Sequence, residues 1–499
     1  MVIGICEGET AGGSICLWKG YETDMKIQKI RFIEPGVRPY KNTILNHLVY
    51  DRYIRTPSVG LNTLATIVKK EYPDTFMYSE AISKIVRQDV LDADVIFIGI
   101  FTFNANRGYQ IARWFKKHTK AVVVMGGLHA TMNYREAVRY CDYVLLGEGD
   151  ESIVELLRAL ESGDPLKVSG LACLREGKLK LTGERRPPEN IDGIADRSLV
   201  YQYRNRVHYN TIWPQVHASR GCPHNCDYCA LVRLYGHRVR TRSVEDVIKD
   251  IQYSLDFFNS GRFPRLLRGV WLTDDNFFAD REWAMAVLHG IIDSGIRTHF
   301  TVQARYEVGF DDEMLTLLKK AGFFQLAIGI EFIDDNEFKT FHKKSTVDEI
   351  RRAIKNIKRH GISIRGLFIM GGDQDREGIG DRLADFVIEN DIKSVVIQSM
   401  YFVPGTPVYE RNRDKLLHEN WSKFNGCVVH YPKQISPYQL QLEHIHACKK
   451  IYSWKRLVRA LIREDWIHKL LFFGEFFWHR SICLDLEEEL PYLKKVSER

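Results

Sequence analysis

The chain has 499 residues, of which 45% are hydrophobic and 27% charged, and its formal net charge at pH 7 is +7. This length predicts about three domains, and the hydrophobic fraction is that of ordinary globular proteins. The small net charge is spread along the chain without a long basic run, so we expect no nucleic-acid partner. The absence of a run of about 18 apolar residues argues against a transmembrane helix.

The first 24 residues lack the basic start and the apolar block of a secretory signal, and we predict that residues 1–24 are an extension of the folded chain. Seven of the ten cysteines are scattered along the chain without paired spacing. This usage is typical of a reducing cytoplasm rather than of a disulfide framework. We therefore predict a cytoplasmic protein.

Residues 25–160 alternate between strand and helix patterns, and continuous apolar runs at 94–100 and 121–125 are typical of buried parallel strands. Two later strands each end in a glycine-rich turn, with the sequences Gly126-Gly127-Leu128-His129-Ala130-Thr131 and Gly147-Glu148-Gly149-Asp150. Ligands bind at the carboxyl ends of strands in a doubly wound sheet, and glycine lets backbone approach a ligand closely. This part of the chain is therefore predicted to be a ligand-binding domain.

Asn104 and Asn106 follow the strand that ends at Ile100. Their amides are suited either to contact the same ligand or to cap the next helix, and the sequence leaves both interpretations open.

Residues 161–212 are predicted to be a linker, with a hairpin around Glu176-Gly177. From 213 to 411 a strand–helix pattern repeats, which favours a right-handed parallel barrel with six strands. We predict strands over 215–219, 269–273, 299–303, 325–331, 363–370 and 395–402. Helices are predicted over 244–258 and 347–360, and residues 412–499 form a mainly helical C-terminal domain.

Three cysteines, Cys222, Cys226 and Cys229, follow the first of these strands at C-x3-C-x2-C spacing. A cubane iron–sulfur cluster normally takes four cysteine ligands, so three would leave one iron open to a ligand from outside the protein. A metal position that is open to an outside ligand is typical of a catalytic centre. The alternative is a structural zinc site with His224 as the fourth ligand, but zinc modules usually present two separated ligand pairs.

The cysteine loop and its flanks resemble the radical S-adenosylmethionine (SAM) superfamily, and the glycine-rich turns resemble the cobalamin-binding domain of its B12-dependent members. The resemblance implies an α/β fold with a Rossmann-like doubly wound cobalamin-binding domain over 25–160, a partial (β/α)6 radical SAM barrel over 213–411 and a helical C-terminus. It also implies a [4Fe-4S] cluster on the three cysteines, SAM, cobalamin, and an electron donor such as flavodoxin or ferredoxin.

Function in such barrels is located at the carboxyl ends of the strands. There the resemblance assigns SAM-binding roles to Asp274, Asp275, Gln303, Arg305, Glu331 and Gly405. The guanidinium of Arg305 suits a carboxylate because it can donate to both oxygens.

The resemblance also implies cobalamin contacts from Asn104, Gly126, Gly127, His129, Gly147, Glu148 and Gly149. The cobalt-ligating motif D-x-H-x-x-G is absent, because Gly127 stands where its aspartate would be. We therefore interpret His129 as a turn residue near the corrin and not as a cobalt ligand. A doubly wound scaffold that binds no ligand is the alternative.

The resemblance implies that SAM is cleaved to methionine and a 5'-deoxyadenosyl radical, and that methylcobalamin then supplies a methyl group to an unactivated carbon. We predict a methyltransferase acting on a lipid, peptide or other hydrophobic substrate. One alternative is a cyclase or oxidase acting on a tetrapyrrole or lipid without methyl transfer. A non-catalytic corrinoid-binding protein is the other.

The stretch Trp466–Arg480 is the most apolar part of the C-terminal region and is too short to span a bilayer. We favour a helix packed over the mouth of the barrel. The alternative is an interfacial helix that makes a peripheral membrane contact.

Overall fold

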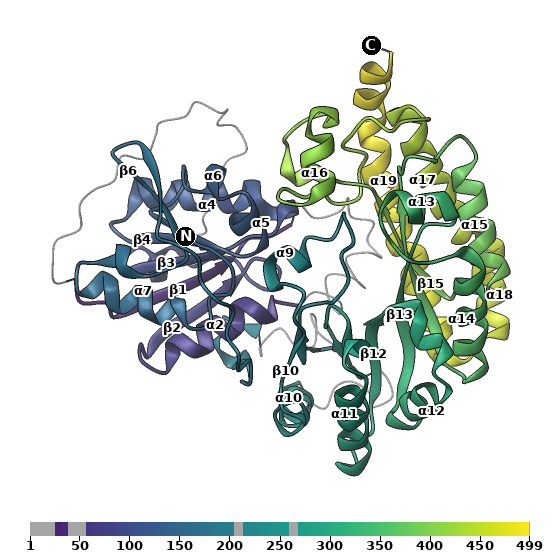
Figure 1. Cartoon of the computed structure of the whole chain (residues 1–499), viewed down its shortest axis with the longest axis horizontal. Helices are drawn as coiled ribbons and strands as arrows, with labels where there is room; N and C mark the ends of the chain where they lie inside the picture. The colour runs from purple at the N-terminus through teal and green to yellow at the C-terminus, as the bar shows by residue number, and fades with distance from the viewer. Residues whose placement is uncertain (1–24, 38–55, 204–212, 259–267, 499) are drawn as a thin grey trace. The chain divides into compact units, whose positions relative to one another are not determined.

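The computed structural model describes residues 25–37, 56–203, 213–258 and 268–498. The predicted extension at 1–24 and the end of the predicted linker, 204–212, lie outside the described residues. Internal contacts divide the described chain into two units (Figure 1). The N-terminal unit comprises 25–37, 56–203 and 230–236, and the C-terminal unit comprises 213–229, 237–258 and 268–498.

The N-terminal unit is built on a seven-stranded sheet with the order β2-β1-β3-β4-β5-β6-β7. Its first five strands are parallel: β1 Lys29–Glu34, β2 Asp74–Ser79, β3 Val95–Gly99, β4 Val122–Gly126 and β5 Tyr143–Leu145. The strand order 2-1-3-4-5 is that of a doubly wound sheet with its switch point between β1 and β3. The predicted fold class of this unit is therefore confirmed.

The helices of this unit follow the strands in the order that the sequence predicts. They are α2 Val59–Lys69, α3 Arg87–Val90, α4 Ala105–His118, α5 Leu128–Met132, α6 Tyr134–Ala137 and α7 Ser152–Glu161.

The hairpin at Glu176-Gly177 belongs to this sheet instead of standing in a separate linker. Strand β6 (Leu171–Arg175) pairs antiparallel with β5 and with β7 (Lys178–Leu181). Glu176 and Gly177 have φ values of 50° and 75°, as a two-residue turn with two positive φ angles requires. The sequence pattern predicted the hairpin but could not show that β6 would find a partner in β5.

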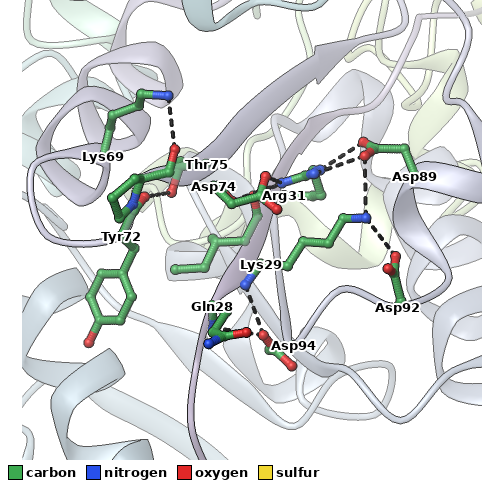
Figure 2. Close-up of polar contacts among 12 residues, drawn as sticks. Gln28, Lys29, Arg31, Lys69, Tyr72, Asp74, Thr75, Asp89, Asp92 and Asp94 are labelled. Atoms are coloured by element: carbon green, nitrogen blue, oxygen red, sulfur yellow. Dashed lines mark hydrogen bonds and ion pairs between the residues drawn. The ribbon is translucent and has the colours of Figure 1, made fainter.

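A charged network fixes the amino ends of the central strands (Figure 2). The buried guanidinium of Arg31 lies 2.8 Å from Asp74 on β2 and 2.7 Å from Asp89, which follows that strand. Burial alone would raise the pKa of Asp89, but the bonds from Arg31 hold it at about 2. Asp94 accepts the backbone N–H groups of Gln28 and Lys29 at 2.8 Å. The opposite, carboxyl edge of the sheet carries the glycine-rich turns.

The C-terminal unit contains a six-stranded sheet in the order β15-β14-β13-β12-β11-β8, and every pair is parallel. Neighbouring strands follow one another in the chain, as in a partial barrel. The strands are β8 Gln215–Val216, β11 Gly269–Leu272, β12 His299–Ala304, β13 Phe323–Glu331, β14 Ser363–Met370 and β15 Ser394–Ser399. All six predicted strands are therefore present.

Helices between these strands cover one face of the sheet (Figure 1). They are α10 Val244–Phe257, α11 Arg281–Asp293, α12 Asp312–Ala321, α14 Val347–Arg359 and α15 Ile379–Glu389. The short helix α13 Asp335–Thr340 lies near the carboxyl end of β14, where its Glu337 accepts the N–H of Gln374 at 2.5 Å. Alternate residues of β12 and β14 are buried against them, which leaves residues such as Gln303 on the other face.

The first barrel strand is shorter than the predicted 215–219. It ends at Val216, and Ser219–Arg220 form a separate strand, β9, which pairs antiparallel with β10 (Arg240–Thr241). The reason is that side chains take the backbone groups in between. Arg242 donates to the carbonyl of His217 at 2.8 Å, and Asp274 accepts the N–H of Ala218 at 3.2 Å.

Three long helices end the chain: α17 Pro437–Ile451, α18 Trp454–Arg463 and α19 Trp466–Ser497. Helix α19 does not cover the mouth of the barrel, in contrast to the favoured prediction. Its Glu475 pairs with Arg365 near the amino end of β14, and His479 lies 3.2 Å from the carbonyl of Val395 at the amino end of β15. Among the described residues, no helix is both long and apolar enough to cross a membrane.

Candidate active site

The cysteine loop lies at the carboxyl end of the first barrel strand, directly after β9. Cys222, Cys226 and Cys229 are all half-buried, and the N–H of Cys229 donates to the carbonyl of Cys226 at 3.0 Å. Burial raises the pKa of the Cys222 thiol, and the neighbouring Cys226 and Asp275 raise it further. A metal that binds this thiol as a thiolate must therefore displace a proton that the fold holds on sulfur.

The two metal centres that the sequence allows differ in how their donor atoms must be arranged. A zinc site needs its sulfur and imidazole atoms to meet at a single ion. In the described parts of the chain, no three cysteine, histidine or carboxylate side chains do so. A cubane cluster binds each thiolate through a different iron and needs sulfurs that are spread apart. Three half-buried cysteines on one loop fit the cluster.

Asp274 and Asp275 hold the chain that leads into the cysteine loop. One oxygen of Asp274 accepts the N–H of Ala218 at 3.2 Å and the hydroxyl of Ser219 at 2.6 Å, and Asp275 accepts the N–H of Gly221 at 3.2 Å. Burial raises the pKa of Asp274 to about 7. Its other oxygen, Oδ2, is buried without a hydrogen-bond partner among the described residues. That oxygen could accept a hydrogen bond from a ligand.

Asp227, inside the loop, ties it to two distant elements that the sequence did not indicate. Its carboxylate lies 3.1 Å from Nδ1 of His342 and 2.5 Å from the guanidinium of Arg411. Its carbonyl accepts the N–H of Val408, in helix α16 (Pro407–Asn412), at 3.3 Å. The loop is thus fixed at both its start and its middle.

Gly405 is the exposed residue of the turn that leads into α16. Its φ of 81° lies in the region that favours glycine. The next residue, Thr406, caps α16 by accepting the N–H of Tyr409 at 3.3 Å. A SAM contact at Gly405 stays a prediction.

Gln303 and Arg305 lie at the carboxyl end of β12, as the sequence predicts. Gln303 is half-buried, while Arg305 has only 17% of its side chain exposed and donates to Glu307, with Nη2 at 2.6 Å from one carboxylate oxygen. This guanidinium therefore already binds a carboxylate. Glu307 is the more exposed partner, with 44% of its side chain accessible, so a ligand carboxylate could replace it.

Glu331 ends β13 in an unusual backbone conformation, with a φ of 70° and a register shift in its pairing with β14. A lysine that the sequence did not indicate supports this bulge. The buried ammonium of Lys343 donates to the carbonyl of Gly329 at 2.6 Å and lies 3.5 Å from Oε1 of Glu331. Burial lowers the pKa of Lys343, and the Glu331 carboxylate opposes that shift.

In the N-terminal unit, the turn after β4 approaches the end of β3 closely. Gly127 has a φ of 91°, and a Cβ at this position would lie 2.8 Å from the carbonyl oxygen of Ile100. Gly126 and Gly127 therefore expose backbone at the carboxyl edge of the sheet. The ring of His129 turns inward, is fully buried and lies 3.2 Å from Oγ1 of Thr102. His129 is therefore buried beneath the turn, and neither its ring nor its backbone is exposed.

A second turn, after β5, is joined to the first. The N–H of Gly147 donates to Oγ1 of Thr131 at 3.1 Å. Gly147 has a φ of 74° and open space where a Cβ would stand, Glu148 is half-buried, and Gly149 is buried against Leu64 and Leu145. Thr131 was part of the turn motif, but its linking role was not predicted.

Asn104 lies at the switch point between β1 and β3. Its side-chain oxygen accepts the N–H of Phe101 at 2.8 Å, and its amide nitrogen donates to the carbonyl of Pro35 at 3.0 Å. The side chain is buried and caps the short 3-10 turn Thr102–Asn104. Beside it, Phe101 and Phe103 stack with ring centres 5.6 Å apart, and Phe101 is exposed. This aromatic pair was not predicted.

Residues 216–385 match the radical SAM superfamily. These residues form a radical SAM domain. The match begins at β8 and includes the cysteine loop, and SAM is accordingly the co-substrate of this protein.

The chain is similar over most of its length to two curated methyl-transferring enzymes. It is 26% identical over 407 residues to bacteriochlorophyllide d C-12(1)-methyltransferase of Chlorobaculum tepidum, a match that covers 81% of this chain and 84% of that protein. It is 27% identical over 371 residues to hopanoid C-2 methylase of Rhodopseudomonas palustris, covering 73% of this chain and 66% of that protein.

The fold of the chain is that of a solved cobalamin-dependent enzyme. The structure of OxsB with aqua-cobalamin and SAM superposes with a TM-score of 0.68 at 14% identity, covering 94% of this chain and 73% of that chain. The match extends over both units, so the predicted combination of a cobalamin-binding fold with a radical SAM barrel is confirmed as a fold.

Proposed function

We propose that this protein is a cobalamin-dependent radical SAM methyltransferase that acts on a hydrophobic substrate. The cysteine loop carries the proposal, since three half-buried thiols stand at the carboxyl end of a six-stranded parallel sheet without a fourth cysteine in their motif. When bound, the cluster, SAM and cobalamin together supply radical formation and methyl transfer to an unactivated carbon.

The residues around the loop supply groups for the amino-acid part of SAM. Cys222, Cys226 and Cys229 would hold the cluster. The buried Oδ2 of Asp274 is an acceptor suited to an ammonium group, and Arg305 is suited to a carboxylate. Glu331, held in its bulge by Lys343, would accept hydrogen bonds from ribose hydroxyls. Gln303 and Gly405 line the same edge of the sheet.

The N-terminal unit offers a surface that fits a flat, bulky group such as a corrin. Backbone is exposed at Gly126, Gly127 and Gly147, and the Phe101–Phe103 stack adds an apolar wall. Glycine matters here because a Cβ would occupy the space of the ligand. We propose that Asn104, His129 and Gly149 shape these turns from within, because their side chains or Cα atoms are buried, and that Glu148 borders the bound ring.

A hydrophobic substrate is supported by what the relatives act on, a bacteriochlorophyllide and a hopanoid by their names. We propose a substrate of similar apolar character. The proposal includes an external one-electron donor such as flavodoxin or ferredoxin, and a cytoplasmic setting in which thiols stay reduced.

The test is one anaerobic incubation of protein reconstituted with iron, sulfide and hydroxocobalamin, with SAM and a strong reductant. We expect 5'-deoxyadenosine and S-adenosylhomocysteine together, because a methyltransferase of this kind consumes SAM in two ways. Deoxyadenosine without S-adenosylhomocysteine would favour the cyclase or oxidase alternative. Formation of neither product, with cobalamin bound, would indicate a non-catalytic corrinoid protein.

A further inference from the structure

Helix α18 presents an apolar stripe to solvent in the C-terminal unit. In the described part of the chain 16 large apolar side chains are exposed, and six of them lie within residues 454–470. On α18 they are Trp454, Val458, Leu461 and Ile462, with exposed fractions of 60%, 55%, 43% and 72%. The spacing i, i+4, i+7, i+8 places them on one side of the helix.

The stripe is distinct from the face by which α18 packs on its own unit. Leu457 and Ala460 are buried and belong to the core, and Arg456 turns inward to donate to the carbonyl of Ile451 at 2.8 Å. Because successive residues are about 100° apart around a helix, these three residues occupy a different sector from the exposed stripe. Trp454 also packs against Phe476 of α19, with ring centres 4.7 Å apart, but Val458, Leu461 and Ile462 are not part of the core. Packing within the unit therefore does not account for these three exposed residues.

A third sector of the same helix is basic. Lys455, Arg459 and Arg463 follow one another at i, i+4 and i+8, are exposed, and lie along one edge of the apolar stripe. No described acidic side chain forms an ion pair with any of the three. The two acidic residues that follow α18 in the chain are occupied elsewhere. Glu464 pairs with Lys393 at 2.7 Å, and Asp465 caps α19 and pairs with His468 at 2.5 Å. The exposed surface thus carries uncompensated positive charge.

The apolar surface continues into the first turns of α19. Trp466 and Leu470 are exposed by 37% and 52%, one helical turn apart. Tryptophans therefore stand at the start of α18 and just beyond its end. Tryptophan side chains are favoured at the boundary between lipid and water because they join an apolar ring to a polar N–H group.

We propose that α18 and the first two turns of α19 bind the surface of an anionic phospholipid membrane. The apolar stripe would enter the boundary between head groups and acyl chains, while Lys455, Arg459 and Arg463 contact lipid phosphates. Charge complementarity favours an anionic membrane as the partner of this surface, because a second copy of the chain would bring its own basic face against the basic face of α18. The proposal goes beyond the proposed function and uses none of the residues assigned to cofactors.

The experiment is flotation of the full chain with vesicles of phosphatidylcholine alone or with added phosphatidylglycerol. We expect binding to the anionic vesicles only, weakened when NaCl is raised, because salt screens the charges. Arg459→Glu/Arg463→Glu should weaken binding at least about tenfold, since each cation near an anionic surface contributes measurably. Leu461→Ser/Ile462→Ser should weaken it by a similar factor, because two apolar side chains no longer insert.

Matched controls are Lys320→Glu/Lys355→Glu and Leu484→Ser, which change exposed residues of the same kinds outside the proposed surface. They should bind as the unaltered chain does. Equal binding by all variants, or no binding to anionic vesicles, would overturn the proposal. Light scattering without vesicles tests whether the surface is a contact between copies of the chain. A lower oligomeric mass in the α18 variants than in the unaltered chain would show such a contact and would also overturn the proposal. Deoxyadenosine formation without vesicles should be the same in all variants, so this test is independent of the proposed function.

Discussion

Asp274 illustrates how a single side chain holds the backbone that leads into the cysteine loop. The resemblance assigned it to SAM, yet one of its oxygens is used to hold Ala218 and Ser219, four and three residues before Cys222. With a pKa near 7, the carboxyl group is partly protonated at neutral pH. Its anchoring role therefore depends on an acceptor oxygen more than on full negative charge.

Two substitutions at Asp274 separate the effect of its acceptor oxygen from the effect of its negative charge. Asp274→Asn keeps an acceptor oxygen and should bind nearly as much iron and sulfide as the unaltered protein after anaerobic reconstitution. Asp274→Ala removes the acceptor, leaves the buried N–H of Ala218 unsatisfied, and should bind less than about half as much. The iron and sulfide contents of both variants are measured on protein that thermal unfolding shows to be folded. Equal iron content in the two variants would contradict the anchoring role.

Gly127 should be intolerant of a side chain. Gly127→Ala places a Cβ 2.8 Å from the carbonyl oxygen of Ile100 at a φ of 91°. We expect the free energy of unfolding to fall by about 2 kcal/mol. Gly60→Ala is the control, because Gly60 lies in α2 with open space around its Cβ. That variant should be as stable as the original or more stable by up to about 1 kcal/mol in urea denaturation.

At the scale of elements, strands and helices with strong local patterns were predicted correctly. The apolar runs gave β3 and β4, and the helix predicted over 244–258 is present as α10, which Ser243 caps by accepting the N–H of Asp246 at 3.3 Å. The break after β8 was missed because it depends on Arg242 and Asp274, which reach residues 25 and 56 positions away. Such contacts leave no periodic signal in the sequence.

The same limit applies to the candidate site. The spacing of the three cysteines predicted their loop, because the whole motif lies within one short stretch of the sequence. Lys343 was missed because a lysine in a charged stretch gives no sign that it will be buried beneath a strand end. The bond from Asp227 to Arg411 joins residues 184 positions apart and was equally invisible. The sequence therefore indicates the chemistry better than the groups that support it.

The connector between β15 and α17 should make the C-terminal unit sensitive to acid. Burial lowers the pKa of His430, which lies 3.1 Å from the carbonyl of Gly371, to about 4. The unfolded chain takes up this proton near its ordinary value of 6.5, so stability is lost as the pH falls from 6.5 towards 4. Between pH 7.5 and 5.5 this histidine should account for about 1.3 kcal/mol of lost stability.

His430→Gln should remove that part of the pH dependence. We expect its free energy of unfolding, from urea denaturation of the iron-free protein, to fall less between pH 7.5 and 5.5 than that of the unaltered chain. His289→Gln, at an exposed position of α11, is the control and should leave the pH dependence unchanged. Identical curves for His430→Gln and the unaltered protein would show that the buried ring does not contribute.

At the scale of the whole molecule, two cofactor-binding folds occur in one chain. Each presents its candidate ligand-binding groups at the carboxyl edge of a parallel sheet, where the ends of strands expose backbone and leave room for loops. The charged network around Arg31 strengthens the opposite edge of the N-terminal sheet, and α19 contacts the opposite end of the barrel strands. In both units, structural support and candidate site thus occupy opposite ends of the strands.

The central claim is that three thiolates hold a cluster whose remaining iron is open to SAM. Electron paramagnetic resonance of the reduced, reconstituted protein, recorded with and without SAM, tests it most directly. We predict the signal of a reduced [4Fe-4S] cluster that changes when SAM is added and that is lost in Cys222→Ser, Cys226→Ser and Cys229→Ser. A protein that binds zinc in place of iron, or a cluster signal that SAM leaves unchanged, would contradict the account.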